Sequence, residues 1–437
     1  MLREKIQAFF LRFGRAFTSR NYRLYCVGQL ITCTGSQVQA IAMGWLVYDL
    51  TNSKTMLGTV MLLSQAPGLF LSPLAGVLMA RFNKRQLLMT VQFLASLHAL
   101  TLAILTYTGI ITPTILLCLA AIMGIITSIE MPTRHSLIYF MVRKPSHLGN
   151  AIAMNSMIFN CGRLVGPAIG GFAISLIKDH WGAAVVAGTL PHDVPGHIGE
   201  SFCFLINSLS YFGAIIALYL MDFVLPPPEK GKKTSSAFLE GFKMAWDYRP
   251  IRVILLMLCF LGFTAMTANT LTPAVARDVL KGDTRFLGML QSSMALGAIL
   301  AALYMASRST LKYFSFHYLI ATLCSGTGLL LYSYSTILRL SCFAMFLLGI
   351  GQILFLATTN TLIQLITPHK YRDRFISFYA ASLLGLVPLG CQLTGWLADH
   401  IGLQTAVRIC GLCAFALFLW YLPNRHYIAE NEKVATS

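Results

Sequence analysis

Residues 150–178 form an apolar stretch that is long enough to cross a lipid bilayer and that carries a single arginine. At a rise of about 1.5 Å per residue, Arg163 lies roughly 20 Å along such a helix, near the middle of an apolar layer about 30 Å thick. A guanidinium at that depth is costly and normally faces protein or a water-filled cavity. Ser156 and Asn160 share its face of the helix. We therefore expect this face to line a polar cavity, although a purely structural role for Arg163, neutralising a buried partner, stays open.

The same stretch places glycines at four-residue spacing around a proline, as Gly162, Gly166, Pro167 and Gly170. Glycines at this spacing form a groove in which a second helix can approach closely, and Gly-Pro allows the helix to bend. These residues therefore predict a tight and bendable contact with another helix.

Composition indicates an integral membrane protein. Of the 437 residues, 56% are hydrophobic and 11% are charged, whereas soluble domains have about 25% charged residues. All eleven cysteines fall in apolar runs and are expected to be small core side chains. We find no nucleotide-binding loop, metal constellation or nucleophile–base pattern, and we therefore expect neither an enzyme nor a cofactor or metal site.

Twelve apolar runs follow one another, with a long polar interruption after the sixth. The first six lie at about 24–48, 57–79, 86–106, 113–140, 150–178 and 201–221, and the second six at about 251–275, 286–307, 314–333, 340–366, 375–397 and 405–421. This pattern predicts an all-α membrane protein with twelve transmembrane helices in two six-helix, pseudo-symmetric halves. Asp179-His180 and Asp399-His400 end the fifth and eleventh runs, as a repeat would.

The predicted domains follow from these runs. We expect a cytoplasmic amphipathic arm at 1–23, an N-terminal half at 24–221, a cytoplasmic linker at 222–250, a C-terminal half at 251–421 and a cytoplasmic tail at 422–437. Lysine and arginine concentrate in the arm, the linker and alternate loops, which places both termini in the cytoplasm. The net charge of +17 is then explained by topology and anionic lipids rather than by nucleic acid.

The glycine-proline segment at 162–171 resembles the motif of the fifth helix that is associated with antiporters of the major facilitator superfamily. The runs at 131–134, 148–156 and 374–377 resemble the branch of that superfamily that includes enterobactin-exporter-like and macrolide-efflux-like carriers. The resemblance covers nearly the whole chain. It implies a substrate site near the midplane between two halves that expose it alternately to the two sides. In such a carrier we expect the glycine groove of 162–170 to contact the other half and to seal the pathway in one state.

The loop after the second run resembles the Gly-x-x-x-Asp-Arg-x-Gly-Arg-Arg gating motif of the superfamily, with two departures. The aspartate is replaced by Ala80 and the second glycine by Asn83, which can also take a left-handed conformation. The first span also has Ser36 where many relatives have a carboxylate. The resemblance implies that the motif aspartate anchors a charge network that closes the cytoplasmic side, so this network is either weakened here or rebuilt from Arg81, Glu130 and Arg134. Glu130 and Arg134, one helical turn apart, fit an ion pair, which could also be an interfacial anchor with no role in transport. The residues expected to act in gating or coupling are Gly76, Arg81, Lys84, Arg85, Glu130, Arg134, Gly162, Gly166, Pro167, Gly170 and Gly171.

Polar residues near the middle of their spans are candidates for the substrate cavity, although any one of them could instead make an ordinary hydrogen bond between helices. They are Gln29, Gln37, Asn160, Arg163, Asn269, Gln291, Gln352 and Asn360.

These features favour a proton-coupled exporter of a small organic molecule in the bacterial cytoplasmic (inner) membrane. The substrate could be a siderophore, an amphipathic drug or another metabolite bearing an acidic or strongly polar group. We expect a monomer that contacts anionic lipids. An importer or lysolipid flippase of the same fold, and a receptor or assembly factor that transports nothing, are the alternatives.

Overall fold

The structure is a computed structural model that describes residues 17–142, 148–186, 196–222, 249–265, 267–307, 314–366 and 372–436. Every regular element in these residues is a helix. Most of the expected arm at 1–23 and of the expected linker at 222–250 lies outside the described residues.

The helices follow the predicted apolar runs closely. In the first half of the sequence they are α2 (Arg20–Thr51), α3 (Lys54–Arg81), α4 (Lys84–Tyr107), α5 (Pro113–Met141), α6 (Leu148–Val186) and α7 (Ile198–Leu220). In the second half the long helices are α9 (Arg249–Thr264), α11 (Thr284–Ser307), α12 (Phe314–Tyr334), α13 (Leu338–Ile366), α14 (Arg372–Ile401) and α15 (Leu403–Thr436).

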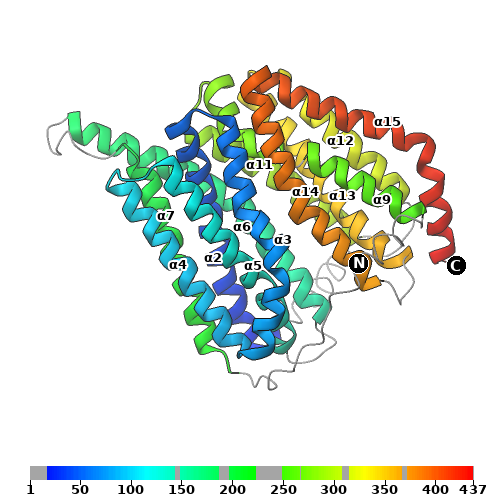
Figure 1. Cartoon of the computed structure of the whole chain (residues 1–437), viewed down its shortest axis with the longest axis horizontal. Coiled ribbons are helices and arrows are strands. Elements are labelled where there is room, and N and C mark those ends of the chain that lie inside the picture. The colour runs from blue at the N-terminus through cyan, green and yellow to red at the C-terminus, as the bar shows by residue number, and fades with distance from the viewer. Residues whose placement is uncertain are drawn as a thin grey trace, which may run out of the picture. The chain divides into compact units, whose positions relative to one another are not determined.

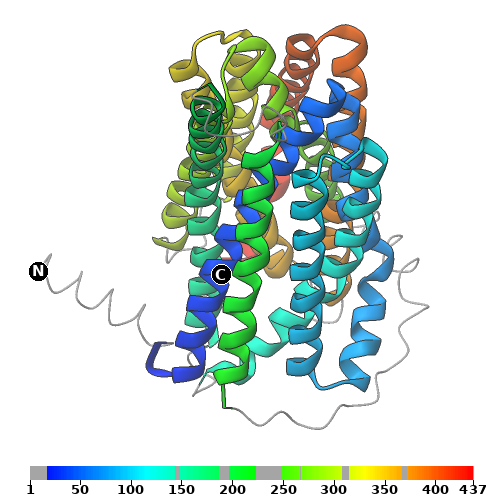
Figure 2. The same ribbon diagram turned by 90° about the vertical axis from the view of Figure 1, so that its left-hand side faces the viewer.

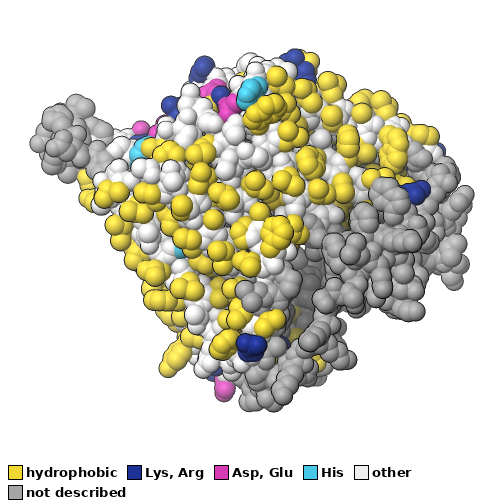
Figure 3. All heavy atoms as spheres, in the orientation of Figure 1, with side chains coloured by type: hydrophobic (Ala, Val, Ile, Leu, Met, Phe, Trp, Pro, Cys, Tyr) yellow, Lys and Arg dark blue, Asp and Glu magenta, His cyan; other side chains and the backbone are white. Residues whose placement is uncertain are grey.

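Among the described residues, ten helical segments are long and apolar enough to cross a membrane, one of them running from α9 through the short helices that follow it. Helices α3 and α14, the second and eleventh in the series, are not among the ten. The all-helical membrane fold is confirmed, and the count of twelve spans stays a prediction. Hydrophobic side chains cover much of the face shown in Figure 3, where charged side chains are few, as suits a surface in contact with lipid.

The chain divides into two compact units. The first unit holds Met1–Leu46 and Phe70–Gly231, and the second holds Val47–Leu69 and Lys232–Ser437. The end of α2 and the first part of α3 therefore belong to the second unit, although they stand early in the sequence. The domain boundaries expected from sequence remain a prediction.

The same helix pairings recur in the two units, six spans apart. In the first unit α4 packs on α7 and α5, and α6 packs on α7; α4 and α7 can be followed in Figure 1 and Figure 2. In the second unit α12 packs on α15 and α13, and α14 packs on α15. These three pairs in one unit each have a counterpart in the other, in agreement with two pseudo-symmetric halves.

Candidate functional site

The seventh apolar run is a broken helix and not the continuous span that its hydropathy suggests. Helix α9 ends at Thr264, and after a turn the chain continues as a 3₁₀ helix, η3 (Ala268–Leu271), the short α10 (Thr272–Ala274) and a π-helical turn, η4 (Val275–Val279). Pro273 contributes to the break because it has no backbone N–H with which to continue the helical ladder.

Side chains donate hydrogen bonds to backbone carbonyl groups at the break. The Thr272 hydroxyl donates to the Asn269 carbonyl at 2.8 Å, and the Thr267 hydroxyl donates to the Thr264 carbonyl at 2.7 Å. The side-chain amide of Gln352, on α13, donates to the Ala265 carbonyl at 2.8 Å. Substitute donors of this kind allow irregular backbone to exist at membrane depth.

Asn269 lies inside this break and brings an unpaired polar atom to it. Its side-chain oxygen Oδ1 is buried, and no hydrogen-bond partner for it exists among the described residues. A buried amide oxygen without a partner costs free energy, and in a native structure it points to a ligand or an ordered water. Of the predicted cavity residues, Asn269 and Gln352 thus both contribute to one feature, the break in the seventh span.

The first unit contains the predicted ion pair. Arg134 hydrogen-bonds Glu130 one turn earlier on α5, and both side chains are buried. The Arg134 guanidinium also lies over the ring of Phe159, 5.3 Å from its centroid. Nearby, the Tyr25 hydroxyl donates to Asn155 at 2.8 Å. The expected local pair between Glu130 and Arg134 is confirmed.

The glycines of α6 contact α2 within the first unit, and this corrects the expectation that their groove contacts the other half. A Cβ atom added at Gly162 would lie 2.7 Å from the Cys33 sulfur, and one at Gly166 would lie 2.4 Å from the Gln37 Cβ. At Gly170 it would lie 3.2 Å from the Val38 backbone. This groove therefore fixes the first span against the fifth.

Arg163 is exposed on α6, on a different side of the helix from the buried glycines. Asn160 is half-buried, and its side-chain nitrogen donates to the Ser156 carbonyl at 3.0 Å. This arrangement agrees with a helix that packs on one side and presents a polar face on another. That this polar face lines a cavity stays a prediction.

The other predicted cavity residues lie in different environments. Gln29 is buried in a small pocket between α2, α4 and α7, which Gln92 also lines. Gln291 is half-buried on α11, and Asn360 is exposed on α13. Asn269 and Gln352 thus both belong to the break in the seventh span, and the joint role of the whole set stays a prediction.

In the loop after α3, Asn83 is the N-cap of α4 and does not adopt a left-handed conformation. Its backbone is extended, at φ −62° and ψ 119°, and its side chain accepts a hydrogen bond from the Arg85 backbone N–H at 2.9 Å. The Arg85 side chain donates to the Tyr219 carbonyl on α7 at 2.6 Å, and Lys84 lies over the Phe140 ring. Arg81 is exposed.

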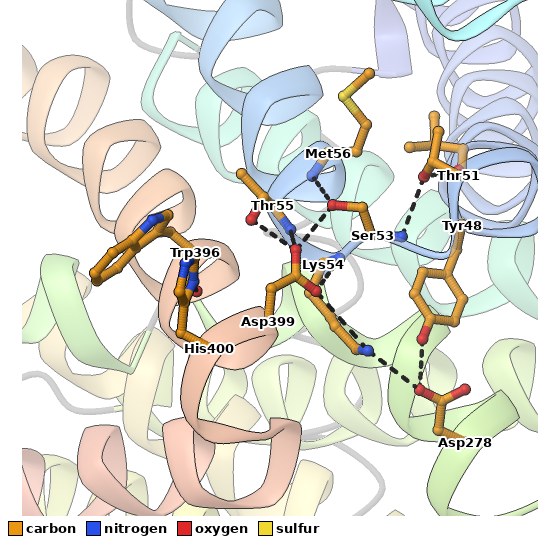
Figure 4. A network of polar contacts seen from close by, with 11 residues as sticks. Tyr48, Thr51, Ser53, Lys54, Thr55, Met56, Asp278, Trp396, Asp399 and His400 are labelled. Atoms are coloured by element: carbon orange, nitrogen blue, oxygen red, sulfur yellow. Dashed lines mark hydrogen bonds and ion pairs between the residues drawn. The ribbon is translucent and has the colours of Figure 1, made fainter.

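A second polar cluster, not identified from the sequence, lies in the second unit at the α2–α3 turn (Figure 4). The Asp399 carboxylate, near the end of α14, accepts hydrogen bonds from the backbone N–H groups of Lys54 and Thr55 at 3.0 and 2.8 Å. Tyr48 donates to Asp278 at 2.5 Å, and the Lys54 ammonium lies 3.7 Å from Asp278.

A further ion pair extends this cluster. Arg277 donates to Asp49 at 2.8 Å, and its guanidinium lies 5.8 Å from the centre of the Tyr48 ring. We refer to Tyr48, Asp49, Ser53, Lys54, Thr55, Arg277, Asp278 and Asp399 as the turn cluster. Lys54, Arg277 and Asp399 were visible as charges at span ends, but their pairing joins residues more than two hundred positions apart.

Comparison with protein families gives a match over nearly the whole chain. The protein family described as "Transmembrane secretion effector" matches residues 15–435. The chain is 24% identical to a staphyloferrin A transporter of Staphylococcus aureus, over 91% of this chain and 95% of that protein. It is 22% identical to the multidrug efflux pump Tap of Mycolicibacterium fortuitum, over 85% of this chain and 87% of that protein.

Solved transporter structures share the fold. A bacterial homologue of the human lysosomal transporter Spinster, in an inward-facing and unoccupied conformation, aligns with a TM-score of 0.68 at 15% identity, over 95% of this chain and 97% of that one. The nucleoside transporter NupG aligns with a TM-score of 0.70 at 10% identity, over 92% and 99%. At such identities these structures support the fold and not a substrate.

Proposed function

Because the chain belongs to the transmembrane secretion effector family of the major facilitator superfamily and is therefore a secondary transporter, we propose that it exports a small organic molecule in exchange for protons. The proposed substrate carries an acidic or strongly polar group. The proposed location is the bacterial inner membrane, with both termini in the cytoplasm, where basic segments contact anionic lipid. The protein is proposed to act as a monomer.

The observation that carries this proposal is the unpaired amide oxygen of Asn269 in the broken seventh span. Transporters of this kind bind substrates and coupling ions where helices are discontinuous, because unwound backbone and side chains there are available to a ligand. A substrate hydroxyl or amine that donates to Asn269 would satisfy the buried oxygen. Gln352 supports the site by holding the Ala265 carbonyl.

We assign proton coupling to the buried pair of Glu130 and Arg134. The first span has Ser36 where a carboxylate would serve this purpose, so another buried carboxylate is needed. Among the described acidic residues, Glu130 and Glu200 are both buried, and Glu200 pairs with Lys178 at 2.7 Å at the start of α7. Protonation of Glu130 would remove the partner charge of Arg134 and so change the packing of α5.

The nature of the substrate follows from Arg163 and from the relatives. An exposed guanidinium on the polar face of α6 suits a carboxylate or another anion. One relative carries the name of a siderophore transporter and another that of a drug efflux pump, and the latter supports export.

The test is transport in proteoliposomes of purified protein. The two probes are radiolabelled staphyloferrin A, a polycarboxylate, and ethidium, a cationic drug probe. In vesicles with the cytoplasmic side outward, an acidic lumen should drive accumulation of the carboxylate probe, and a protonophore should abolish it. Accumulation that ignores the protonophore would contradict proton coupling.

The alternatives give different results in this assay. An importer that moves the probe together with protons would accumulate it only in vesicles of the opposite orientation and with an acidic medium. A lysolipid flippase would move a fluorescent lysolipid between leaflets while moving neither probe. A receptor would bind a probe without any flux.

A further inference from the structure

The carboxylate of Asp399 caps the first turn of a helix that is distant in sequence. Helix α3 begins at Lys54, and the first N–H groups of any helix have no partner within it. The first turn of α3 has a local cap, because the Ser53 hydroxyl accepts a hydrogen bond from the Met56 N–H at 3.2 Å. Asp399 supplies a second cap from α14, accepting from Lys54 and Thr55, the latter 344 positions away in the sequence.

Hydroxyl groups complete the surroundings of this carboxylate. Ser53 and Thr55 donate their hydroxyls to Asp399 at 2.8 and 2.6 Å, and the Lys54 ammonium lies 3.8 Å away. The carboxylate therefore accepts four hydrogen bonds from three consecutive residues, at the positive end of the α3 dipole. Bonds of this kind to an ionised acceptor are about twice as strong as those between neutral groups.

The backbones of α3 and α14 also pack closely along the first part of α3. A Cβ atom at Gly395 would lie 2.4 Å from the Lys54 carbonyl oxygen, and one at Gly58 would lie 2.5 Å from the Cys391 carbonyl oxygen. Further along, a Cβ at Gly385 would lie 3.2 Å from the Leu69 side chain. The first part of α3 thus lies antiparallel to α14, and its position is fixed by shape as well as by charge.

From these contacts we propose that Asp399 is the gating residue that holds the α2–α3 turn on α14, and that this carboxylate must release the turn during each transport cycle. The inference rests on the alternating access of the proposed function. Residues 47–69 belong by sequence to the first six-helix half but lie within the second compact unit. Any movement that separates the two six-helix halves where the α2–α3 turn meets α14 must break the contacts of Asp399.

The remaining charges of the turn cluster do not substitute for this cap. Asp49 is paired with Arg277, and Asp278 binds Tyr48 and Lys54. His400, next to Asp399, turns back along α14, where its Nδ1 lies 2.8 Å from the Trp396 carbonyl. Asp399 is therefore the carboxylate in this cluster that binds the backbone of α3 directly.

Hydrogen–deuterium exchange on the full-length protein in lipid nanodiscs tests the proposal without any substrate. In D399N the amide side chain places a donor toward the N–H groups of α3. We expect exchange at 53–57 to rise about tenfold or more and to rise across 47–69, while α12 and α13 stay unchanged. The matched control is D283N, because Asp283 caps its own helix by accepting from the Arg285 N–H at 3.0 Å; it should change only the start of α11.

Three further variants, one of them a control, keep the test decisive if D399N folds poorly. T55V removes one hydroxyl donor at constant shape and should give a smaller rise over the same residues. G58A should act like D399N by steric obstruction, whereas G68A should not, because a Cβ there would lie 3.9 Å from Leu384.

A rise confined to the amides of Lys54 and Thr55 would overturn the proposal, since Asp399 would then be a local helix cap. Unchanged exchange in D399N would overturn it as well. A turn that loosens as expected in a protein that moves neither transport probe would contradict the proposed function, and only the role of Asp399 in holding the α2–α3 turn would stand.

Discussion

Gln352 donates its side-chain amide to the carbonyl oxygen of Ala265 at 2.8 Å, at the point where α9 has just ended. Ala265 is fully buried, so water cannot replace this donor. In Gln352→Met, which preserves the length of the side chain, the carbonyl loses its partner. We expect the free energy of unfolding to fall by about 1–3 kcal/mol, measured as a lower midpoint of thermal unfolding in detergent.

Gln291→Met serves as the control for this prediction. Gln291 is half-buried on α11 in the same unit, and its replacement should change stability by less than about 0.5 kcal/mol. Equal effects of the two substitutions would show that the hydrogen bond of Gln352 does not stabilise the break.

Alanine should destabilise the protein at Gly166 but not at Gly213. A Cβ at Gly166 would lie 2.4 Å from the Gln37 Cβ and 2.9 Å from the Thr34 carbonyl oxygen, so α6 must move away from α2. Overpacking of this kind costs about 1–3 kcal/mol. At Gly213 the nearest atom lies 3.5 Å away on Ile31, which leaves room for the methyl group.

The thermal midpoint in detergent again provides the measurement. Gly166→Ala should lower it, and Gly213→Ala should leave it unchanged or raise it, because alanine is favoured over glycine inside helices by about 0.5–1 kcal/mol. A Gly166→Ala protein as stable as the wild type would mean that the close approach of α6 and α2 is not required.

The sequence predicts most helix positions because apolar length is what a membrane span requires. The break in the seventh span is the main exception. Hydropathy is the same for a broken helix as for a continuous one, and the bonds that make the break tolerable come partly from Gln352 on α13. Pro273 was a local hint, but a proline near a helix end is also ordinary.

Local pairs in the candidate sites could likewise be predicted, and distant ones could not. Glu130 and Arg134 are one turn apart, so their spacing alone indicates a contact. Asp399 and Thr55 are separated by 344 positions, and no sequence period relates them. The direction of the glycine groove of α6 was predicted wrongly, because small residues indicate a close contact but not which helix makes it.

Breaking the buried ion pair should destabilise the protein, and removing it completely should not. Glu130→Gln leaves the Arg134 charge buried without its partner, which costs about 3–5 kcal/mol. The double variant Glu130→Gln, Arg134→Met removes both charges and should recover most of this loss. If Glu130 carries the coupling proton, the double variant should fold well and still fail to accumulate the carboxylate probe in response to an acidic lumen.

Recovery of proton-driven accumulation together with stability would assign the pair a structural role only. Thermal unfolding and vesicle transport, measured on the same preparations, separate the two outcomes.

The Asp399 contacts should depend on pH only in strongly acidic solution. Burial alone would raise the pKa of this carboxyl, but the hydrogen bonds from Thr55, Lys54 and Ser53 outweigh it and lower the pKa below the usual value. A carboxyl whose pKa is lower in the folded state stabilises that state at higher pH, and the stabilisation is lost as the pH falls through the folded-state pKa. Exchange at 53–57, corrected for its intrinsic pH dependence, should therefore stay constant from about pH 5 to 8 and rise only below about pH 4.

A rise that already begins between pH 5 and 8 would contradict this prediction, because the Asp399 carboxylate would then not control the contact. His400→Gln, at the neighbouring residue, should leave exchange at 53–57 unchanged.

Arg163 should matter for binding more than for folding. Its side chain is exposed on α6, so Arg163→Ala should change the free energy of unfolding by less than about 0.5 kcal/mol. Loss of a charge-assisted hydrogen bond to an acidic substrate costs about 1.5–3 kcal/mol, which corresponds to binding weaker by about 10- to 100-fold.

Titration calorimetry with staphyloferrin A measures this effect. The control is Arg339→Ala, which removes another exposed arginine at the start of α13 and should leave the affinity unchanged. A misfolded Arg163→Ala protein would assign this guanidinium a structural role, and a stable one with unaltered affinity would place the substrate anion elsewhere.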